Sequence, residues 1–377
     1  MESNIPSLPF CPPPKDQKGE NKIQFFDFTS LQKEGKVPKE FIWPSENWVK
    51  SSGEIIKLPL IDIGAIKSDE AAMSYAAEIV RKACIEHGAF EVTNIGVDSD
   101  FINDVLQETN NIFKLPLSKK ISAIAKDSGF SVAHAERYTT VLPWKETFTF
   151  MFKHNTKNDT QVVDAIDSLL GEEFQQAGLV YQKYCNAMNE LSEVIMELLA
   201  ISLGVDRKHY QRFFEDAESM MRCNFYPPCS ASLSGALGNG PHCDPISITI
   251  LLQDQVGGLE IFADNKWLAL PPKPNTLVIN IGDTFMALTN GLYKSCLHRV
   301  LVSNKVERKS LTFFMNPRGD KIVSPPKELL GKDEARKYPD YKWLDLYKFT
   351  QKTRRVDAKT LDSFIAWRSS SQPSNSN

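Results

Sequence analysis

The sequence predicts an α+β chain with an all-β core, either an antiparallel β-sandwich or a jelly roll, flanked by helices on both sides. Three observations support this class. Segments before residue 216 carry apolar residues at helical spacing, whereas from about Met220 short apolar segments are separated by turn residues. Two segments near the C-terminus again have helical character. Because no linker rich in Pro, Ser or Gly interrupts mid-chain, we expect the first half to pack against the sheet.

The elements of the first half follow from periodicity and end signals. Strands are expected over 58–63 and 90–94, and helices over 69–87, 98–113 and 172–203. Gly88 and Gly204 follow the last periodic residues of two helices, and Pro116 lies beyond the end of the third.

In the second half, turn residues set the boundaries. Turn pairs stand at Pro227-Pro228, Gly257-Gly258, Pro271-Pro272 and Asn290-Gly291. Between and after them, strand-like segments include 246–252, 293–302 and 310–315, and helices are expected over 333–349 and 358–367.

These patterns divide the chain into five expected regions. They are a disordered arm (1–22), an N-terminal helical region packed on the core (40–215), a β-rich core (216–330), C-terminal helices (331–368) and a disordered tail (369–377). The arm is rich in Pro, Lys and Glu and the tail in Ser and Asn, both without apolar periodicity.

Charge and hydropathy exclude broad classes of partner. With 44 basic and 47 acidic residues among 377, the net charge is -3, so no basic surplus attracts nucleic acid or anionic lipid. The mean hydropathy is -0.30, and no apolar run approaches the ~20 residues of a membrane span. We therefore expect no nucleic-acid partner and no membrane partner, and no obligate protein partner is evident.

Cysteine usage and the first residues indicate a compartment. The seven cysteines are scattered and contain no C-x-x-C pair, which is unlike a disulfide framework or a zinc knuckle. The N-terminal residues include Glu2 and several prolines where a signal peptide needs a positive start and an apolar stretch. We expect a cytoplasmic protein.

Two histidines and one aspartate form the strongest candidate for a metal site. His242 and Asp244 precede the strand-like 246–252, and residues two apart on an extended backbone point to the same face. His298 lies in the β-like stretch 293–302. Two imidazoles and one carboxylate leave opposite metal positions open, as in non-haem Fe(II) oxygenases. Zinc is the competing metal, and a turn aspartate beside a structural histidine is the competing interpretation.

A guanidinium and a hydroxyl follow the distal histidine. Arg308 lies ten residues after His298, just before the strand-like segment 310–315. Arg308 and Ser310 are two residues apart, so on an extended backbone they point to the same face. Such a pair suits a carboxylate held by a bidentate ion pair and one further hydrogen bond. We expect this strand to lie beside the one that carries His298.

Together these residues resemble the plant 2-oxoglutarate and Fe(II)-dependent dioxygenases. The family pattern is H-x-D, a distant His and then R-x-S, matched here by His242, Asp244, His298, Arg308 and Ser310. Further similar segments are N-F-Y-P-P-C at 224–229, N-I-G-D at 280–283, L-P-L-I-D at 58–62 and E-H-G-A-F at 86–90. The resemblance spans about residues 40–368 and implies a double-stranded β-helix, or jelly roll, in the core.

Within this family the chain is most similar to gibberellin 20-oxidases. The segment 142–147 reproduces their L-P-W-K-E-T motif. Other similar stretches are F-I-W-P at 41–44, G-P-H-C-D-P at 240–245, Q-D-Q-V-G-G-L at 253–259 and G-D-T-F-M-A-L-T-N-G at 282–291. The chain departs from the pattern at Ile95 and Leu252, where the family and the subfamily respectively usually have histidine.

The resemblance implies the cofactors and their ligands. His242, Asp244 and His298 would bind Fe(II), and 2-oxoglutarate would be held by the residues Asn224, Tyr226, Arg308 and Ser310, with Arg308 the catalytic anchor. Oxygen would be the second cosubstrate, and ascorbate would help to keep the iron as Fe(II). The region 216–330 would then be the catalytic core.

The resemblance also implies a substrate. It would be a gibberellin carboxylic acid such as GA12 or GA53, oxidised successively at carbon 20 to give C19 gibberellins. A largely apolar pocket with one or two cations would suit such a molecule. Trp144 and Lys145 are the candidates for an apolar wall and a cation; the alternative is a packed turn and a solvated lysine.

Other functions remain open from the sequence. The same metal and cosubstrate residues would serve a gibberellin 3-oxidase or 2-oxidase or a flavonoid oxidase, and the fold would also suit a non-catalytic binding protein. We expect Cys243, between the two metal ligands, to point away from the metal. The remaining histidines are expected to be structural or exposed: His87, His134, His154 and His209.

Overall fold

The computed structural model describes residues 26–34, 37–43, 50–125, 128–133, 141–154, 159–229, 235–331, 336–353 and 356–371. The predicted N-terminal arm and His134 lie outside the described residues. None of the helices in these ranges combines the length and the hydropathy needed to cross a bilayer.

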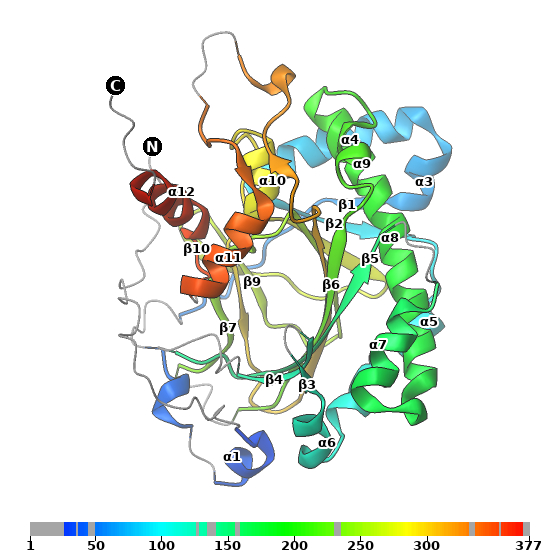
Figure 1. Cartoon of the computed structure of the whole chain (residues 1–377), viewed down its shortest axis with the longest axis vertical. Coiled ribbons are helices and arrows are strands. Elements are labelled where there is room, and N and C mark those ends of the chain that lie inside the picture. The colour runs from blue at the N-terminus through cyan, green and yellow to red at the C-terminus, as the bar shows by residue number, and fades with distance from the viewer. Residues whose placement is uncertain are drawn as a thin grey trace.

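A nine-stranded major sheet runs through the described part of the chain (Figure 1). In spatial order its strands are β1 (Leu60–Asp62), β2 (Ala89–Thr93), β11 (Thr276–Ile281), β8 (Ile248–Gln253), β13 (Arg308–Asn316), β6 (Glu218–Tyr226), β5 (Glu146–Lys153), β4 (Ser128–Val132) and β3 (Ile124–Ala125). All neighbours pair antiparallel except β1 and β2, which are parallel.

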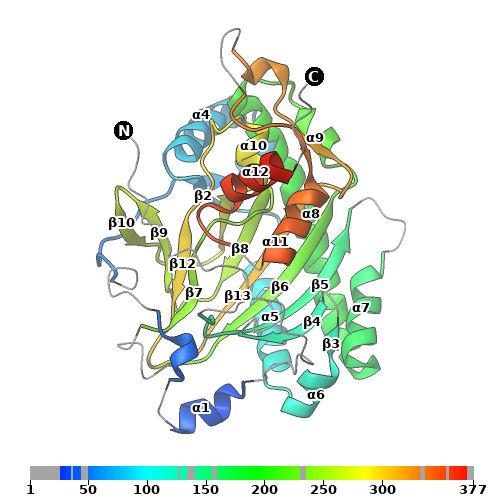
Figure 2. The same cartoon turned by 60° about the vertical axis from the view of Figure 1, so that its left-hand side comes forward.

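A four-stranded minor sheet faces the major sheet. Its antiparallel strands, in spatial order, are β10 (Lys266–Ala269), β9 (Leu259–Ala263), β12 (His298–Leu301) and β7 (Leu237–His242). From β7 to β13 the chain passes repeatedly from one sheet to the other, which is the path of a jelly roll. The predicted jelly roll is therefore confirmed, and Figure 2 shows the minor strands beside β8, β13 and β6.

Helices from the first half cover one face of the major sheet (Figure 1). The main ones are α4 (Glu70–Glu86), α5 (Ser99–Phe113), α7 (Gln161–Leu170) and α8 (Gln175–Leu203). Their apolar faces and those of the strands share one hydrophobic core, so the first half packs on the sheet as expected. Gly204 ends α8 as predicted, in the left-handed conformation at φ 71°, and the first residues of two expected helices, Asp69 and Asp98, are the N-caps of α4 and α5.

Shorter helices complete the first half and the connections. They are α1 (Phe28–Glu34), η1 (Lys39–Phe41), α3 (Ile63–Ser68), α6 (Leu117–Ser122), η2 (Glu172–Phe174), α9 (His209–Phe213) and α10 (Asp283–Leu288). The aromatic rings of Phe28 and Phe41 from α1 and η1 pack in a second apolar cluster with residues of both sheets.

The C-terminal segment lies on the other side of the major sheet from α8 (Figure 1). It contains β14 (Ile322–Val323), η4 (Lys327–Leu329), β15 (Tyr341–Lys342), α11 (Trp343–Thr353) and α12 (Thr360–Ser371). The helix predicted over 333–349 begins only at Trp343, because Pro339 cannot continue a helix and Tyr341 pairs with Val323. Conversely, α12 continues three residues past the boundary expected at Arg368.

The first half also contributes strands that periodicity did not identify. The segment 146–153 forms β5, which pairs along its whole length with β6 and brings β3 and β4 into the major sheet. Most of its residues are buried, so the alternation that marks a half-exposed strand is missing. This extension gives the major sheet the width on which the cavity described below is built.

Candidate active site

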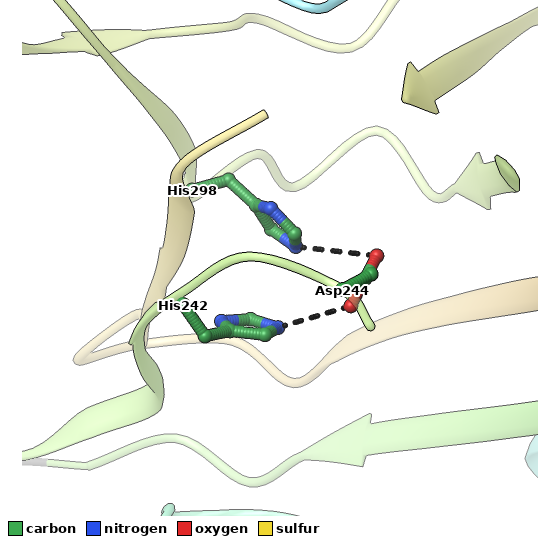
Figure 3. A group of neighbouring side chains, drawn as sticks. All are labelled: His242, Asp244 and His298. Atoms are coloured by element: carbon green, nitrogen blue, oxygen red, sulfur yellow. Dashed lines mark ion pairs between the residues drawn. The ribbon is translucent and has the colours of Figure 1, made fainter. Parts of the chain in front are cut away.

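The predicted metal residues converge on one point (Figure 3). His242 ends β7, His298 begins β12, and the two are paired across the minor sheet, while Asp244 lies in the loop after β7. The Nε2 atoms of His242 and His298 lie 3.5 and 3.9 Å from the two Asp244 carboxylate oxygens. All three residues are buried, and their ligand atoms lie within 4.8 Å of one another. This spacing suits a single metal ion bound by one atom of each residue.

Hydrogen bonds aim each ligand at that point. The Nδ1 atom of His242 lies 2.8 Å from the carbonyl oxygen of Gly240, and the Nδ1 atom of His298 lies 3.0 Å from that of Cys296. Since a carbonyl oxygen only accepts, both Nδ1 atoms carry the proton and both Nε2 atoms keep a lone pair, the form that binds a metal; that of His242 accepts from the side-chain amide of Asn239 at 3.1 Å. Thr249 on β8 donates its hydroxyl to Oδ2 of Asp244 at 2.6 Å, which fixes the carboxylate.

The protonation states suit metal binding. Burial alone would raise the pKa of Asp244, but the attraction of His298 and His242 and the hydrogen bond from Thr249 outweigh it, so the pKa lies below its ordinary value. Burial lowers the pKa of His298 to about 4. At neutral pH the site therefore presents an anionic carboxylate beside a neutral imidazole of His298, the forms that coordinate metals.

The N-I-G-D motif at 280–283 packs against the loop that carries Asp244, called the metal loop below. A Cβ atom on Gly282 would collide with the carbonyl oxygen of Ile246 and lie 2.9 Å from that of Asp244. The next residue, Asp283, donates its backbone N–H to the Asp244 carbonyl oxygen at 2.8 Å. Only glycine permits this close approach, so the turn between β11 and α10 holds the backbone of the metal loop in place.

Arg308 and Ser310 lie on the opposite sheet. The expectation that their strand neighbours that of His298 is wrong: β13 lies between β8 and β6 of the major sheet, whereas β12 lies between β9 and β7. In a jelly roll, successive strands alternate between sheets, so chain proximity did not give strand pairing. The two strands instead face each other across a shared cavity whose lining includes His298 and Arg308.

Arg308 is a buried cation with unsatisfied donors. Its side chain is 1% exposed, its guanidinium lies 4.9 Å from the Tyr226 ring centroid, and Nη2 donates to Oε1 of Gln253 at 3.0 Å. Its Nε and Nη1 atoms have no partner among the described residues, and none of the described carboxylates lies within 4.0 Å to form an ion pair. A buried guanidinium with unsatisfied donors favours an anionic ligand such as a carboxylate.

The other predicted cosubstrate residues surround this guanidinium. In the register of β13 and β6, Arg308 lies opposite Tyr226 and Ser310 opposite Asn224. The side-chain amide of Asn224 donates to Oγ of Ser310 at 3.4 Å, which leaves the serine proton available for another acceptor. Gln253, which sequence reasoning did not assign, holds Arg308 by a hydrogen bond, the one such side-chain contact within the described ranges; its position opposite Ser310 on β8 is set by strand pairing.

A cavity of about 450 Å³ joins the metal residues to Arg308 and continues along the major sheet. Its far part is lined by α11 and by one face of β5, β6 and β13, which sequence reasoning did not identify. These residues include Met151, Met220, Arg222, Phe314, Trp343, Leu346 and Tyr347. The lining is mostly apolar, so the cavity can take a largely apolar organic molecule next to the metal residues.

Comparisons with known proteins identify the family. Residues 217–317 match the 2OG-Fe(II) oxygenase superfamily, and residues 58–167 match the "non-haem dioxygenase in morphine synthesis N-terminal" family. The chain is 44% identical over 373 residues to Gibberellin 20 oxidase 2 of Oryza sativa subsp. indica, covering 97% of this chain and 95% of the relative. It belongs to the 2OG-Fe(II) oxygenase family. It is therefore an Fe(II)- and 2-oxoglutarate-dependent dioxygenase.

Two further relatives agree with this placement. Gibberellin 20 oxidase 3 of Arabidopsis thaliana is 44% identical over 360 residues, covering 93% of this chain and 94% of the relative. The crystal structure of JOX2 in complex with 2OG, Fe and JA superposes with a TM-score of 0.78 at 26% identity, covering 91% of this chain and 98% of that one. The jelly roll and the cofactors Fe(II) and 2-oxoglutarate are thus those of the family.

The geometry fits both cofactors of this oxygenase. The two imidazoles and the carboxylate are the donor set that non-haem Fe(II) accepts, and the unpaired guanidinium donors of Arg308 match the carboxylate of a keto diacid. Because Fe(II) chemistry of this kind leaves three coordination positions open, the residues present do not need to be supplemented by another protein ligand.

The two tentative substrate residues of the oxygenase differ in outcome. Trp144 does not line the cavity: it is 1% exposed, packs edge-on against Phe28 and Phe41, and donates Nε1 to the Pro227 carbonyl oxygen at 3.1 Å. We therefore correct its assignment from apolar wall to packed turn, the alternative left open by the sequence. Lys145 lines the cavity and is buried, so the solvated-lysine alternative does not describe it.

The departures from the family pattern lie away from the cavity. Leu252 on β8 faces the helix-covered core, while its neighbour Leu251 faces the cavity, as strand alternation requires. Ile95 packs against the edge of the same core. Cys243 turns from the metal point toward the Ser295 carbonyl oxygen, at 3.8 Å from Sγ, as expected for a packed residue.

The remaining described histidines do not join the metal cluster. His87 caps the end of α4 and His209 begins α9, which fits a structural role. His154 is buried rather than in polar surroundings: it packs on the rings of Phe152 and Phe313, and its Nε2 lies 2.7 Å from Oγ of Ser219.

Proposed function

We propose that this dioxygenase is a gibberellin 20-oxidase, which oxidises carbon 20 of C20 gibberellins such as GA12 and GA53 in successive steps and gives C19 gibberellins. The observation that carries the proposal is the 44% identity to Gibberellin 20 oxidase 2 of rice over nearly the full length of both chains. The L-P-W-K-E-T motif at 142–147 supports it. The apolar cavity beside the metal residues is suited to a tetracyclic acid.

In this proposal His242, Asp244 and His298 hold Fe(II). When bound there, iron supplies the activation of O2, coupled to decarboxylation of 2-oxoglutarate to succinate and CO2. The protein keeps the ligands ready through the Gly240 and Cys296 carbonyls, which fix the imidazole tautomers, so little rearrangement is needed when the metal binds.

Arg308 anchors the distal carboxylate of 2-oxoglutarate. Its Nη1 group, which has no partner among the described residues, donates to the carboxylate, and Ser310 donates its hydroxyl while accepting from Asn224. Tyr226 supports the guanidinium with its ring, and its hydroxyl is a further candidate donor. These contacts orient the keto acid end toward the metal residues on the facing sheet.

The helix α11 closes the substrate side of the cavity. Trp343, Leu346 and Tyr347 of α11 line the cavity, and the rings of Trp343 and Tyr347 stack at 5.4 Å. Their apolar surface excludes water from the reacting carbon and leaves the substrate as the only group to be oxidised.

We place the enzyme in the cytoplasm, a proposal supported by six free, buried cysteines among the described residues.

A product assay tests the function. The purified protein is incubated with GA12, Fe(II), 2-oxoglutarate and ascorbate, and products are identified by mass, with a flavanone as competing substrate. The proposal expects successive alcohol and aldehyde products at carbon 20, then loss of that carbon, with release of succinate. An Asp244→Ala variant should abolish all products.

Other outcomes identify other proteins. Hydroxylated gibberellins that retain carbon 20 unchanged would indicate a 2- or 3-oxidase, and turnover of the flavanone alone would indicate a flavonoid oxidase. Binding of GA12 without succinate release would indicate a non-catalytic binding protein.

A further inference from the structure

The cavity face of the major sheet is organised in rows. Side chains alternate along a strand, and the five cavity-lining residues of β6 are Glu218, Met220, Arg222, Asn224 and Tyr226. Each has a partner on β13 that points to the same face, and all but Tyr226 also have one on β5. Strand pairing therefore assigns every side chain of this face to a defined depth in the cavity.

The deepest row belongs to the cosubstrate. Arg308 pairs with Tyr226, and Glu146 pairs with Phe225, so Lys145, which directly precedes β5, continues that register to the position beside Tyr226. Lys145 lines the cavity together with the metal residues His242 and His298. Lys145 therefore lies at the end of the cavity where Arg308 would bind 2-oxoglutarate. It is too far from the rest of the cavity to bind the distant part of the organic substrate.

The third row contains another cation. Arg222 on β6 pairs with Thr312 of β13 and Thr149 of β5, four residues along the strand from Tyr226. At about 3.3 Å per residue this separates the Arg222 row from the Arg308 row by roughly 13 Å. One small keto diacid cannot reach from Arg308 to the metal residues and also to this row, so Arg222 faces the space left for the substrate.

The contacts of Arg222 hold its guanidinium at the cavity wall. Its Nε donates to Oγ1 of Thr149 at 3.3 Å, its Nη2 lies 3.3 Å from Sδ of Met220, and the group lies 5.4 Å from the ring centroid of Phe314. Met220 and Phe314 form the next row toward the mouth. The charge thus lies beside the apolar wall, where a ligand with an apolar body and one carboxylate would meet both features.

We propose that Arg222 binds a carboxylate of the organic acid substrate and so determines which acid is accepted and which carbon lies next to the metal residues. The inference rests on the proposed function for the class of substrate, a polycyclic carboxylic acid, and adds the residue that recognises it. The two arginines that line the cavity then have separate tasks: Arg308 selects 2-oxoglutarate, and Arg222 selects the substrate.

The test compares a free acid with its ester. The holoenzyme and its Arg222→Gln, Arg222→Lys and Arg212→Gln variants are assayed with GA12 and with each GA12 monomethyl ester. Binding is measured separately by calorimetry without O2, with Fe(II) and 2-oxoglutarate present. Arg212→Gln is the matched control, because Arg212 is exposed and pairs with Asp206 outside the cavity.

The expected result is selective. Arg222→Gln should weaken GA12 binding and raise its KM by roughly 10- to 100-fold, since a charge-assisted hydrogen bond is lost, while the KM for 2-oxoglutarate stays unchanged. One of the two monomethyl esters lacks the carboxylate that Arg222 binds. Its affinity for the wild type should be as low as that of GA12 for Arg222→Gln, and the substitution should not lower it further. Arg222→Lys should fall between, and Arg212→Gln should match the wild type.

The outcomes separate the two proposals. If the wild type neither binds nor oxidises gibberellins, the proposed function fails. If it does, but Arg222→Gln binds GA12 as tightly as the wild type, the inference about Arg222 is wrong. It is also wrong if the variant loses the acid and both esters equally, or if its KM for 2-oxoglutarate rises in parallel, because those results indicate general disruption of the cavity.

Discussion

Replacement of Thr249 by valine tests how Asp244 is held for the metal. The Thr249 hydroxyl is buried and donates to Oδ2 of Asp244 at 2.6 Å, and it contributes to the lowered pKa of that carboxyl group. Valine has nearly the same shape but no donor, so the variant removes this one hydrogen bond and leaves the packing almost unchanged.

The magnitude follows from the type of bond. A hydrogen bond to a charged group contributes about 1.5–3 kcal/mol, and each 1.4 kcal/mol is a factor of about ten in an equilibrium constant. Fe(II) should therefore bind Thr249→Val roughly 10- to 100-fold more weakly than the wild type, because the carboxylate is free to turn away from the metal point. Once saturated with iron, the variant should retain most of its turnover.

The assay is an anaerobic titration of metal-free protein with Fe(II) in competition with a chelator of known affinity. Thr249→Ser is the matched control, since it keeps the hydroxyl and loses only a methyl group, and it should bind iron nearly as the wild type does. The reasoning is refuted if Thr249→Val binds Fe(II) with wild-type affinity. It is equally refuted if Thr249→Ser is as weak as Thr249→Val, since packing and not the hydrogen bond would then matter.

Three more predictions concern buried ionisable side chains. Arg308→Met should raise the KM for 2-oxoglutarate by roughly 100-fold with little change in GA12 binding, as measured by initial rates and calorimetry, because the lost guanidinium holds the cosubstrate; equal loss for both ligands would contradict this. Burial lowers the pKa of His154 to about 4, below its unfolded value near 6.5. The unfolded state therefore binds more protons between these values, and acidification from about pH 7 to pH 5 should remove about 2 kcal/mol of stability through this residue. Urea unfolding should show this loss in the wild type and a smaller loss in His154→Gln. Lys120 and Glu146 form a buried ion pair at 2.6 Å, so Lys120→Met should cost about 3–5 kcal/mol in urea unfolding. Adding Glu146→Leu should recover much of that loss; a double variant as unstable as the single one would show that packing of the Lys120 chain dominates.

The sequence predicted those helices whose ends carry a capping residue or a glycine. The helices α4, α5 and α8 end or begin at Asp69, Asp98 and Gly204, because capping and left-handed positions are properties of single residues. The strand β5 escaped prediction because most of its residues are buried and do not alternate with exposed ones, and the helix over 333–349 was overextended because Pro339 lies inside an otherwise periodic stretch.

The candidate site shows the same division. The metal set could be predicted because His242 and Asp244 are two residues apart and His298 and Arg308 stand in a recognisable order along the chain. The error in placing β13 beside β12 came from treating chain proximity as spatial proximity, whereas Trp144 was assigned to the cavity wall from the position of its motif alone.

The sequence by itself determined the class of chemistry: an α+β chain with a jelly-roll core, two histidines and an aspartate for iron, and a guanidinium with a hydroxyl for a keto diacid. These are properties of residue types and short spacings. Only the tertiary structure decided which groups share a cavity and at what depth. It put Lys145 with Arg308 and set Arg222 apart from them, because that order depends on strand register, and register is set by pairing between segments distant in the chain.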